Sequence, residues 1–143
     1  MRLALQTDYA LRTLMVLATR QERVKIDDVA ELFGISRDHV AKVVNQLARL
    51  GFVRSIRGAG GGIELGRQPD QISIGQIIVA FEGPMNLLDC VAMDNVCVIE
   101  KFCKLKGVLA EAERVQREYL ESVSLADILP TKRQLTVVSI STK

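Results

Sequence analysis

The 143-residue sequence contains no tryptophan, a single histidine and only 4% aromatic residues. One histidine argues against a histidine-based metal centre, and so few aromatic rings argue against a stacking platform for single-stranded nucleic acid. No stretch approaches the roughly 18 apolar residues of a membrane span. The apolar beginning is interrupted by Asp8 and Arg12, so it does not read as a secretory signal peptide. We therefore expect a cytoplasmic protein that does not enter a membrane.

The net charge is also small. Nineteen basic against seventeen acidic residues leave +2, which by itself indicates no nucleic acid or membrane partner. The charges are unevenly distributed, however: residues 1–70 hold eleven basic and eight acidic side chains, and residues 71–143 hold eight and nine. A chain of this length is expected to form one core of ordinary size that needs no disulfide. The two halves therefore differ in charge, the first being basic and the second slightly acidic.

Three helices and a hairpin are predicted in the first seventy residues. Apolar residues recur at helical spacing over 6–20, within 26–36 and over 37–50. We expect the starts of these helices to be capped by Thr7 or Asp8, by Asp27 and by Ser36. A turn containing Gly34 separates the second helix from the third, which is the layout of a helix-turn-helix. The glycine run GAGGG then separates two short strands. The expected fold class is mainly α with a small β-hairpin wing, a winged helix-turn-helix.

The second half is predicted to hold a loop and a long helix. Ser73 can cap a further helix, and Gly83-Pro84 marks its end. From Lys104 to about Val123 an apolar stripe keeps helical spacing, too long for so small a domain to cover. A second copy is the simplest cover, so a homodimer is expected. We expect a DNA-binding domain over 1–83, a cysteine loop over 84–104 and a dimerisation helix with a loose final dozen residues over 105–143.

The third helix and the hairpin carry the residues expected to contact double-stranded DNA. Residues 36–67 hold six basic and two acidic side chains. A charged helix face or a glycine turn alone is ordinary, but a helix-turn-helix followed by a basic helix face and a glycine-rich wing favours DNA binding. The single His39 reads as a solvent-facing residue at a helix start. The expected contacts are Ser36, Arg37, Asp38, Lys42, Asn45, Gln46 and Arg49 on the helix and Arg54, Arg57 and Gly60 on the wing.

All three cysteines lie within fourteen residues of the loop, as Cys90, Cys97 and Cys103. Neither the C-x2-C turn of structural zinc sites nor a redox C-x-x-C is present. Three buried small residues would be the ordinary interpretation, but their crowding favours an inorganic centre. The wide spacing suits an iron-sulfur cluster held by three thiolates and one further group; we favour 4Fe-4S over 2Fe-2S. A carboxylate is the expected fourth ligand, from Asp8, Asp89, Asp94 or Glu100.

Several segments together resemble the Rrf-type winged-helix regulators: MRLALQTDYALRTL, ISRDHVAKVVNQLARLGFV, RGAGGGIELG, and the three cysteines before a long helix. The resemblance implies a homodimer with one cluster per subunit on palindromic operators. It also implies ligation by Cys90, Cys97 and Cys103, with Asp8 reached from the other subunit. Within the family, the nitric-oxide-sensing repressors are the most similar, which implies that nitric oxide damages the cluster and releases DNA. A related regulator uses a histidine where this chain has Lys106.

Other interpretations remain open. An iron- or oxygen-responsive iron-sulfur regulator would use the same DNA-binding half, and loop length does not separate it from a nitric oxide sensor. A thiol redox switch is disfavoured, because no C-x-x-C is present and no base stands beside a nucleophile. A zinc-stabilised interaction module is a further possibility. No enzyme activity is predicted.

Overall fold

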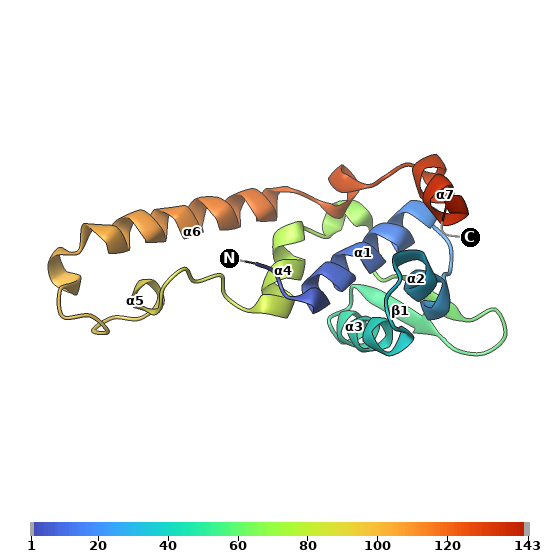
Figure 1. The fold of residues 1–143 in the computed structure, drawn as a ribbon, viewed down its shortest axis with the longest axis horizontal. Coiled ribbons are helices and arrows are strands. Elements are labelled where there is room, and N and C mark those ends of the chain that lie inside the picture. Colours follow the sequence, from blue (N-terminus) through green and yellow to red (C-terminus); the bar gives the residue numbers. More distant parts are fainter. Residues whose placement is uncertain (1, 142–143) are drawn as a thin grey trace.

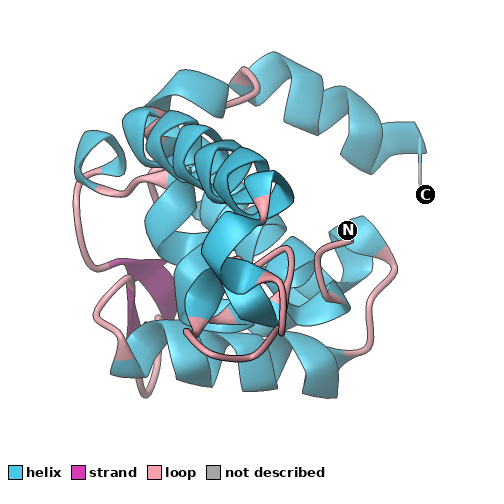
Figure 2. Cartoon of the chain, turned by 90° about the vertical axis from the view of Figure 1, so that its left-hand side faces the viewer, coloured by secondary structure: helices cyan, strands magenta, loops and turns pink. Residues whose placement is uncertain are grey.

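The computed structural model of the chain describes residues 2–141. Helices make up most of it, and a two-stranded antiparallel hairpin forms the sheet (Figures 1 and 2), so the predicted fold class is confirmed. In chain order the elements are α1 (Leu5–Arg20), α2 (Ile26–Phe33), α3 (Arg37–Arg49), β1 (Val53–Ile56), β2 (Gly62–Leu65), the 3-10 turn η1 (Pro69–Gln71), α4 (Ile74–Glu82), α5 (Asp89–Ala92), η2 (Glu100–Phe102), α6 (Lys104–Ser122), η3 (Leu125–Ile128) and α7 (Lys132–Ser141).

The core lies where α1 packs against α3 and α4. The apolar stripes that predict these helices are buried: Leu14 of α1, Leu47 of α3 and Ile77 of α4 are fully inaccessible to solvent. Burying each of these side chains contributes about 1.5–3 kcal/mol. Because α1 contacts both α3 and α4, it is the central element through which the first half of the chain is held together.

The helix ends test the expected caps. Ser36 accepts a hydrogen bond from the backbone N–H of His39 at 3.2 Å, and Gly34 closes α2 at φ 62°, both as predicted. The caps expected at Thr7 or Asp8 and at Asp27 are wrong, because α1 starts at Leu5 and α2 at Ile26. These residues lie inside the first turns, where they cannot act as the residue that precedes the helix.

The two strands of the hairpin pair with each other, and β2 also pairs with the segment before α2. Its register pairs Arg54 with Glu64 and Ile56 with Gly62, and Val24 adds a bridge to β2 through hydrogen bonds of 3.0 and 2.8 Å with the backbone of Ile63. Gly62 permits this approach, since a Cβ there would lie 2.9 Å from the carbonyl oxygen of Val24. The wing is therefore attached to the loop between α1 and α2.

Helix α6 projects from the body of the molecule, with the loop that carries α5 running beneath it (Figure 1). Its C-terminal end packs on α4, where Gly75 faces Glu121 so closely that a Cβ would lie 2.8 Å from the Glu121 backbone nitrogen. The predicted long helix is confirmed over Lys104–Ser122. Within residues 2–141, none of the helices has the length and apolar character required to cross a membrane.

The C-terminal segment differs from the expectation of a loose end. Residues Lys132–Ser141 form α7, and its start is capped: the Thr131 N–H donates to Gln134 Oε1 at 2.8 Å, and the Gln134 N–H donates to Thr131 Oγ1 at 3.2 Å. The pattern T-x-x-Q is a capping-box signal. The rest of the final dozen, residues 142–143, lies outside the described residues.

The C-terminal part also contributes to the core formed by the first half of the chain. Leu125 of η3 is fully buried in the same core as α1 and α3, and its N–H donates to the carbonyl of Ile72 at 2.7 Å. The stretch after α6 thus returns to the core formed by the first half of the chain, and the division at residues 83 and 104 stays a prediction.

Candidate nucleic-acid interface and cysteine loop

The exposed face of α3 carries the side chains expected to read DNA. Lys42, Asn45 and Arg49 are exposed, and their spacing of three and four residues places them on one side of the helix. Arg37 and Asp38 are exposed at the start of α3. Arg37 pairs with Asp27 of α2 at 2.8 Å, so it joins the two helices of the helix-turn-helix.

Gln46 departs from this pattern. It is half-buried, and its Nε2 donates a hydrogen bond to the carbonyl oxygen of Ala80 in α4 at 3.2 Å. The expectation that Gln46 is exposed beside Asn45 is therefore wrong. Gln46 lies three residues after Val43, which is buried in the core, and residues so spaced share a helix face. That face is directed at α4.

Both wing arginines are exposed, and one of them is also paired within the hairpin. Arg57 is exposed at the base of the glycine turn, and Gly60 at its tip is exposed with φ 73°. Arg54 pairs with Glu64 across the hairpin at 3.1 Å. Arg23 also pairs with Glu64 at 3.3 Å and donates to the carbonyl of Gly60 at 3.2 Å. Sequence reasoning missed Arg23, because its partners lie about forty residues away and only folding brings them together.

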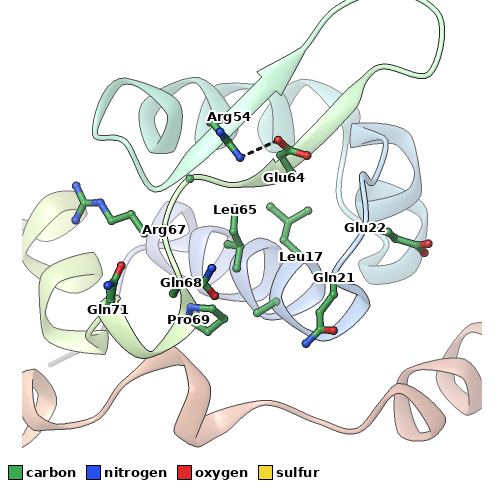
Figure 3. A pocket seen from close by; sticks show the side chains of 12 residues that line it. Leu17, Gln21, Glu22, Arg54, Glu64, Leu65, Arg67, Gln68, Pro69 and Gln71 are labelled. Carbon is green, nitrogen blue, oxygen red and sulfur yellow. Dashed lines mark ion pairs between the residues drawn. The ribbon is translucent and has the colours of Figure 1, made fainter.

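A hollow of about 640 Å³ lies between the wing, the end of α1 and η1, and Figure 3 shows the side chains that line it. The Arg54–Glu64 pair lies on its rim. Arg67 is occupied as well, since its guanidinium stacks 4.5 Å from the centre of the Phe52 ring and donates to the carbonyl of Leu50 at 3.0 Å. Arg67 therefore holds the wing against the end of α3, while Arg54 joins the two strands of the hairpin.

The three cysteines lie along the loop between α4 and α6 as free thiols. Cys90, in α5, and Cys103, directly before α6, are half-buried, and Cys97 is exposed. Within residues 2–141, no three cysteine, histidine, aspartate or glutamate side chains are gathered as a metal-binding group. The donors match an iron-sulfur cluster in kind, because three soft sulfur donors lie in one solvent-accessible loop. Bringing the three sulfurs together requires the loop to rearrange.

Two of the candidate carboxylates in the loop are already engaged. Lys106 Nζ contacts Glu100 Oε1 at 2.6 Å and Asp94 Oδ1 at 3.0 Å, and the other Glu100 oxygen accepts from the Asn95 N–H at 2.6 Å. The hydrogen bond and positive charge of Lys106 lower the pKa of the Asp94 carboxyl, while Glu100 and Asp94 raise the pKa of Lys106. These contacts fold the segment between Asp94 and Glu100 onto the start of α6.

Asp8 lies far from the loop in sequence, on the first turn of α1. Its Oδ1 accepts a hydrogen bond from Arg12 Nε at 2.9 Å, and both side chains are more than a third exposed. The Arg12 guanidinium also lies 5.5 Å from the centre of the Phe33 ring of α2. Asp8 is thus accessible to another molecule, and any ligand it takes must compete with Arg12.

Comparisons with known proteins extend over nearly the whole chain. A model of the Rrf2 family, described as "Iron-dependent Transcriptional regulator", matches residues 3–131. The chain is 40% identical to the HTH-type transcriptional regulator NsrR of Bacillus subtilis over 138 residues, 94% of each chain. It is 41% identical to the regulator of the same name from Bacillus licheniformis over 132 residues, 90% of this chain and 92% of that one.

Solved structures agree with these sequence matches. CymR, the global cysteine regulator of B. subtilis, superposes with a TM-score of 0.75 at 26% identity and covers 89% of this chain and 95% of its own. IscR of T. potens superposes with a TM-score of 0.71 at 27% identity, covering 89% of this chain and 85% of its own.

Proposed function

The chain belongs to the Rrf2 family of transcriptional regulators, and from this premise we propose that it is a cytoplasmic, homodimeric repressor that senses nitric oxide through an iron-sulfur cluster. The family assignment identifies a regulator and not an enzyme. The observation that supports the finer proposal most is the 40% identity to NsrR regulators over 94% of the chain, combined with three thiols in one accessible loop.

DNA contact is assigned to the exposed faces of α3 and the wing. Asn45 is suited to hydrogen-bond an adenine edge, while Lys42 and Arg49 are suited to guanine or phosphate. Arg57 and the bare backbone at Gly60 suit a minor groove or its phosphates. In a dimer, two such units must match half-sites about 34 Å apart, so a small change in the orientation of α3 weakens both contacts together.

Dimer formation is assigned to α6. Leu105, Val108, Val115 and Tyr119 are 52–67% exposed, and they form a stripe along the helix beside the half-buried Leu109 and Leu120. A monomer rarely leaves so continuous an apolar stripe in water. A second copy of α6 covers it with matching residues, as a two-fold interface requires.

Cluster ligation is assigned to Cys90, Cys97, Cys103 and Asp8 of the partner subunit. When bound, an iron-sulfur cluster supplies iron that nitric oxide attacks. Lys106 supports the choice of Asp8, because it holds two nearer carboxylates, Asp94 and Glu100. A hard carboxylate oxygen is a weak, exchangeable ligand for soft iron. Asp8 is also well placed to transmit a change in the loop to the DNA-reading helix, because it lies on α1, which packs on α3.

The test uses protein purified without oxygen. We expect iron and acid-labile sulfide in the preparation, a visible absorption band that nitric oxide bleaches, and loss of affinity for a duplex operator selected by the protein from random DNA. Asp8→Ala should leave the fold intact and speed cluster loss, whereas the matched change Asp89→Ala should not. Protein without iron and sulfide, or operator affinity insensitive to nitric oxide, contradicts the proposal.

The family description favours one alternative, because it names an iron-dependent regulator. In that case a chelator that lowers free iron within the physiological range should release the operator in the absence of nitric oxide. Reversible disulfide formation in protein that lacks iron would instead indicate a thiol switch. The same preparation therefore separates the three mechanisms.

A further inference from the structure

The last turn of α4 contacts both the reading helix α3 and helix α1, which packs on it. Ala80 accepts the hydrogen bond from Gln46 of α3 at 3.2 Å. Two residues later, Glu82 Oε1 accepts from the backbone N–H of Ala4 at 2.7 Å and from the Thr7 hydroxyl at the start of α1. One turn of helix is thus bonded to the middle of α3 and to the beginning of α1.

The Glu82 carboxylate is held at the start of α1 by a buried hydroxyl and by the helix end itself. Thr7 is fully buried, so its hydroxyl is fixed in place beside the carboxylate. The first backbone N–H groups of a helix lack partners within the helix and carry a partial positive charge. Glu82 supplies a negative acceptor at that end of α1, which has no cap from its own N-cap residue, Ala4.

The same turn leads directly into the cysteine loop. Gly83 ends α4 with φ 78° and the chain then leaves the helix, with Cys90 only eight residues beyond Glu82. The loop is held a second time where the Leu87 N–H donates to the Glu113 carboxylate of α6. A rearrangement of the loop that gathers its thiols therefore pulls on a segment anchored between α6 and the last turn of α4.

We propose that the last turn of α4 couples the cysteine loop to the reading helix, with Gln46 and Glu82 as the positioning residues that transmit the change. Gln46 then fixes the orientation of α3 through its bond to α4, while its neighbour Asn45 faces the DNA. The coupling has two states, in which the Gln46–Ala80 hydrogen bond is either formed or broken. The cysteine loop shifts the equilibrium between these states by moving α4, and bound DNA shifts it by moving α3. This inference rests on the proposed function for its signal, though not for its direct test.

The first measurement is the ratio of operator affinities before and after nitric oxide, by fluorescence anisotropy. We expect Gln46→Met, which keeps the length and loses the donor, to reduce this ratio at least about threefold, since coupling factors of about 5–150 are typical. Glu82→Ala should do the same, and Glu82→Gln, which still accepts both bonds, should restore the wild-type ratio. Asn45→Ala should weaken binding in both states and leave the ratio unchanged.

The second measurement needs no cluster. Coupling is reciprocal, so operator DNA should change the alkylation rate of Cys90 in the cluster-free protein, measured with N-ethylmaleimide and mass spectrometry at saturating DNA. We expect a change of at least about twofold in the wild type that disappears in Gln46→Met. Simple shielding of Cys90 by DNA would persist in that variant.

The two measurements separate the two ideas. If nitric oxide leaves the wild-type affinity unchanged while DNA still alters Cys90 through Gln46, the proposed signal is wrong and the coupling stands. If DNA has no effect on Cys90, or has the same effect in Gln46→Met as in the wild type, the coupling is overturned. A loss of base preference in Gln46→Met, with its ratio intact, would return Gln46 to the base-reading residues.

Discussion

Arginines of this chain illustrate how the same side chain serves different purposes at different positions. Arg54 is paired with Glu64, and Arg67 stacks on Phe52 while bonding to the Leu50 carbonyl. Arg57 is exposed beside the glycine turn. Exposed ion pairs contribute little to stability, so these residues differ mainly in whether the guanidinium is displayed to a partner. Arg54 is exposed too, but its guanidinium is shared with Glu64, so among the described residues Arg57 is the wing arginine that has no ion pair to break on binding DNA.

Replacing Arg57 by alanine should weaken operator binding by roughly fivefold and lower the salt dependence by about one counterion, as expected when one phosphate contact is lost. Anisotropy titrations at several salt concentrations measure both quantities. Arg67→Ala serves as the comparison: it should lower the free energy of unfolding, because its bonds are internal, with a smaller change in the salt slope. Unaltered affinity and slope in Arg57→Ala would remove the wing from the DNA interface.

Helices in this fold are positioned by close approaches that small residues permit. Gly75 of α4 lies against Glu121 of α6 with room for no side chain: a Cβ would lie 2.8 Å from the Glu121 backbone nitrogen. Gly107, in the exposed first half of α6, has nothing within 4 Å of its Cβ position. The same residue type therefore has a packing role in one helix and none in the other.

These two glycines predict opposite effects of alanine. Gly75→Ala should force α4 and α6 apart and lower the free energy of unfolding by about 1–3 kcal/mol, the usual range for overpacking. Gly107→Ala should stabilise the protein by about 0.5–1 kcal/mol, because alanine loses less backbone entropy in a helix. Chemical denaturation of the two variants measures both. Equal stability of Gly75→Ala and the wild type would show that α6 shifts freely on α4.

At the level of the whole molecule, α6 presents two distinct faces. The half-buried side, with Leu109 and Leu120, is directed toward the rest of the chain, and the exposed stripe that includes Val108, Val115 and Tyr119 is not covered by it. A repressor that reads two half-sites needs two copies of α3 at a set separation. The proposed α6 interface would provide that separation.

Val115→Lys should convert the dimer to a monomer, because it places a charge in the centre of the apolar stripe. Sedimentation at micromolar concentration should show the change, and operator affinity should fall by more than about tenfold as the second half-site contact is lost. Ala110→Lys, on the opposite exposed face of the same helix, should leave the protein dimeric. A wild-type chain that sediments as a monomer at every concentration would refute the α6 interface.

Local patterns in the sequence are sufficient for the order of α1 to α4, the wing and α6, because they depend on neighbours three or four residues apart. The apolar stripes of α1 and α3, the Ser36 and Ser73 caps and the glycine turn of the wing all act over such short distances. The C-terminal helix α7 forms where a loose segment is expected, although its Thr131–Gln134 capping box is an equally local signal.

The placement of side chains within those elements was decided by packing between distant segments. Gln46 lies at the border between the exposed and buried faces of α3, and its Nε2 is engaged only because Ala80 of α4 lies within hydrogen-bonding distance. Glu82 reaches Thr7 across more than seventy residues of chain, and Leu125, which follows α6, enters the core that contains α1 and α3. Such contacts depend on which faces meet in three dimensions, which residue spacing does not encode. The cysteines depend on both local and distant contacts. Their spacing in the sequence indicates a shared centre, while convergence of their sulfurs depends on how the loop folds.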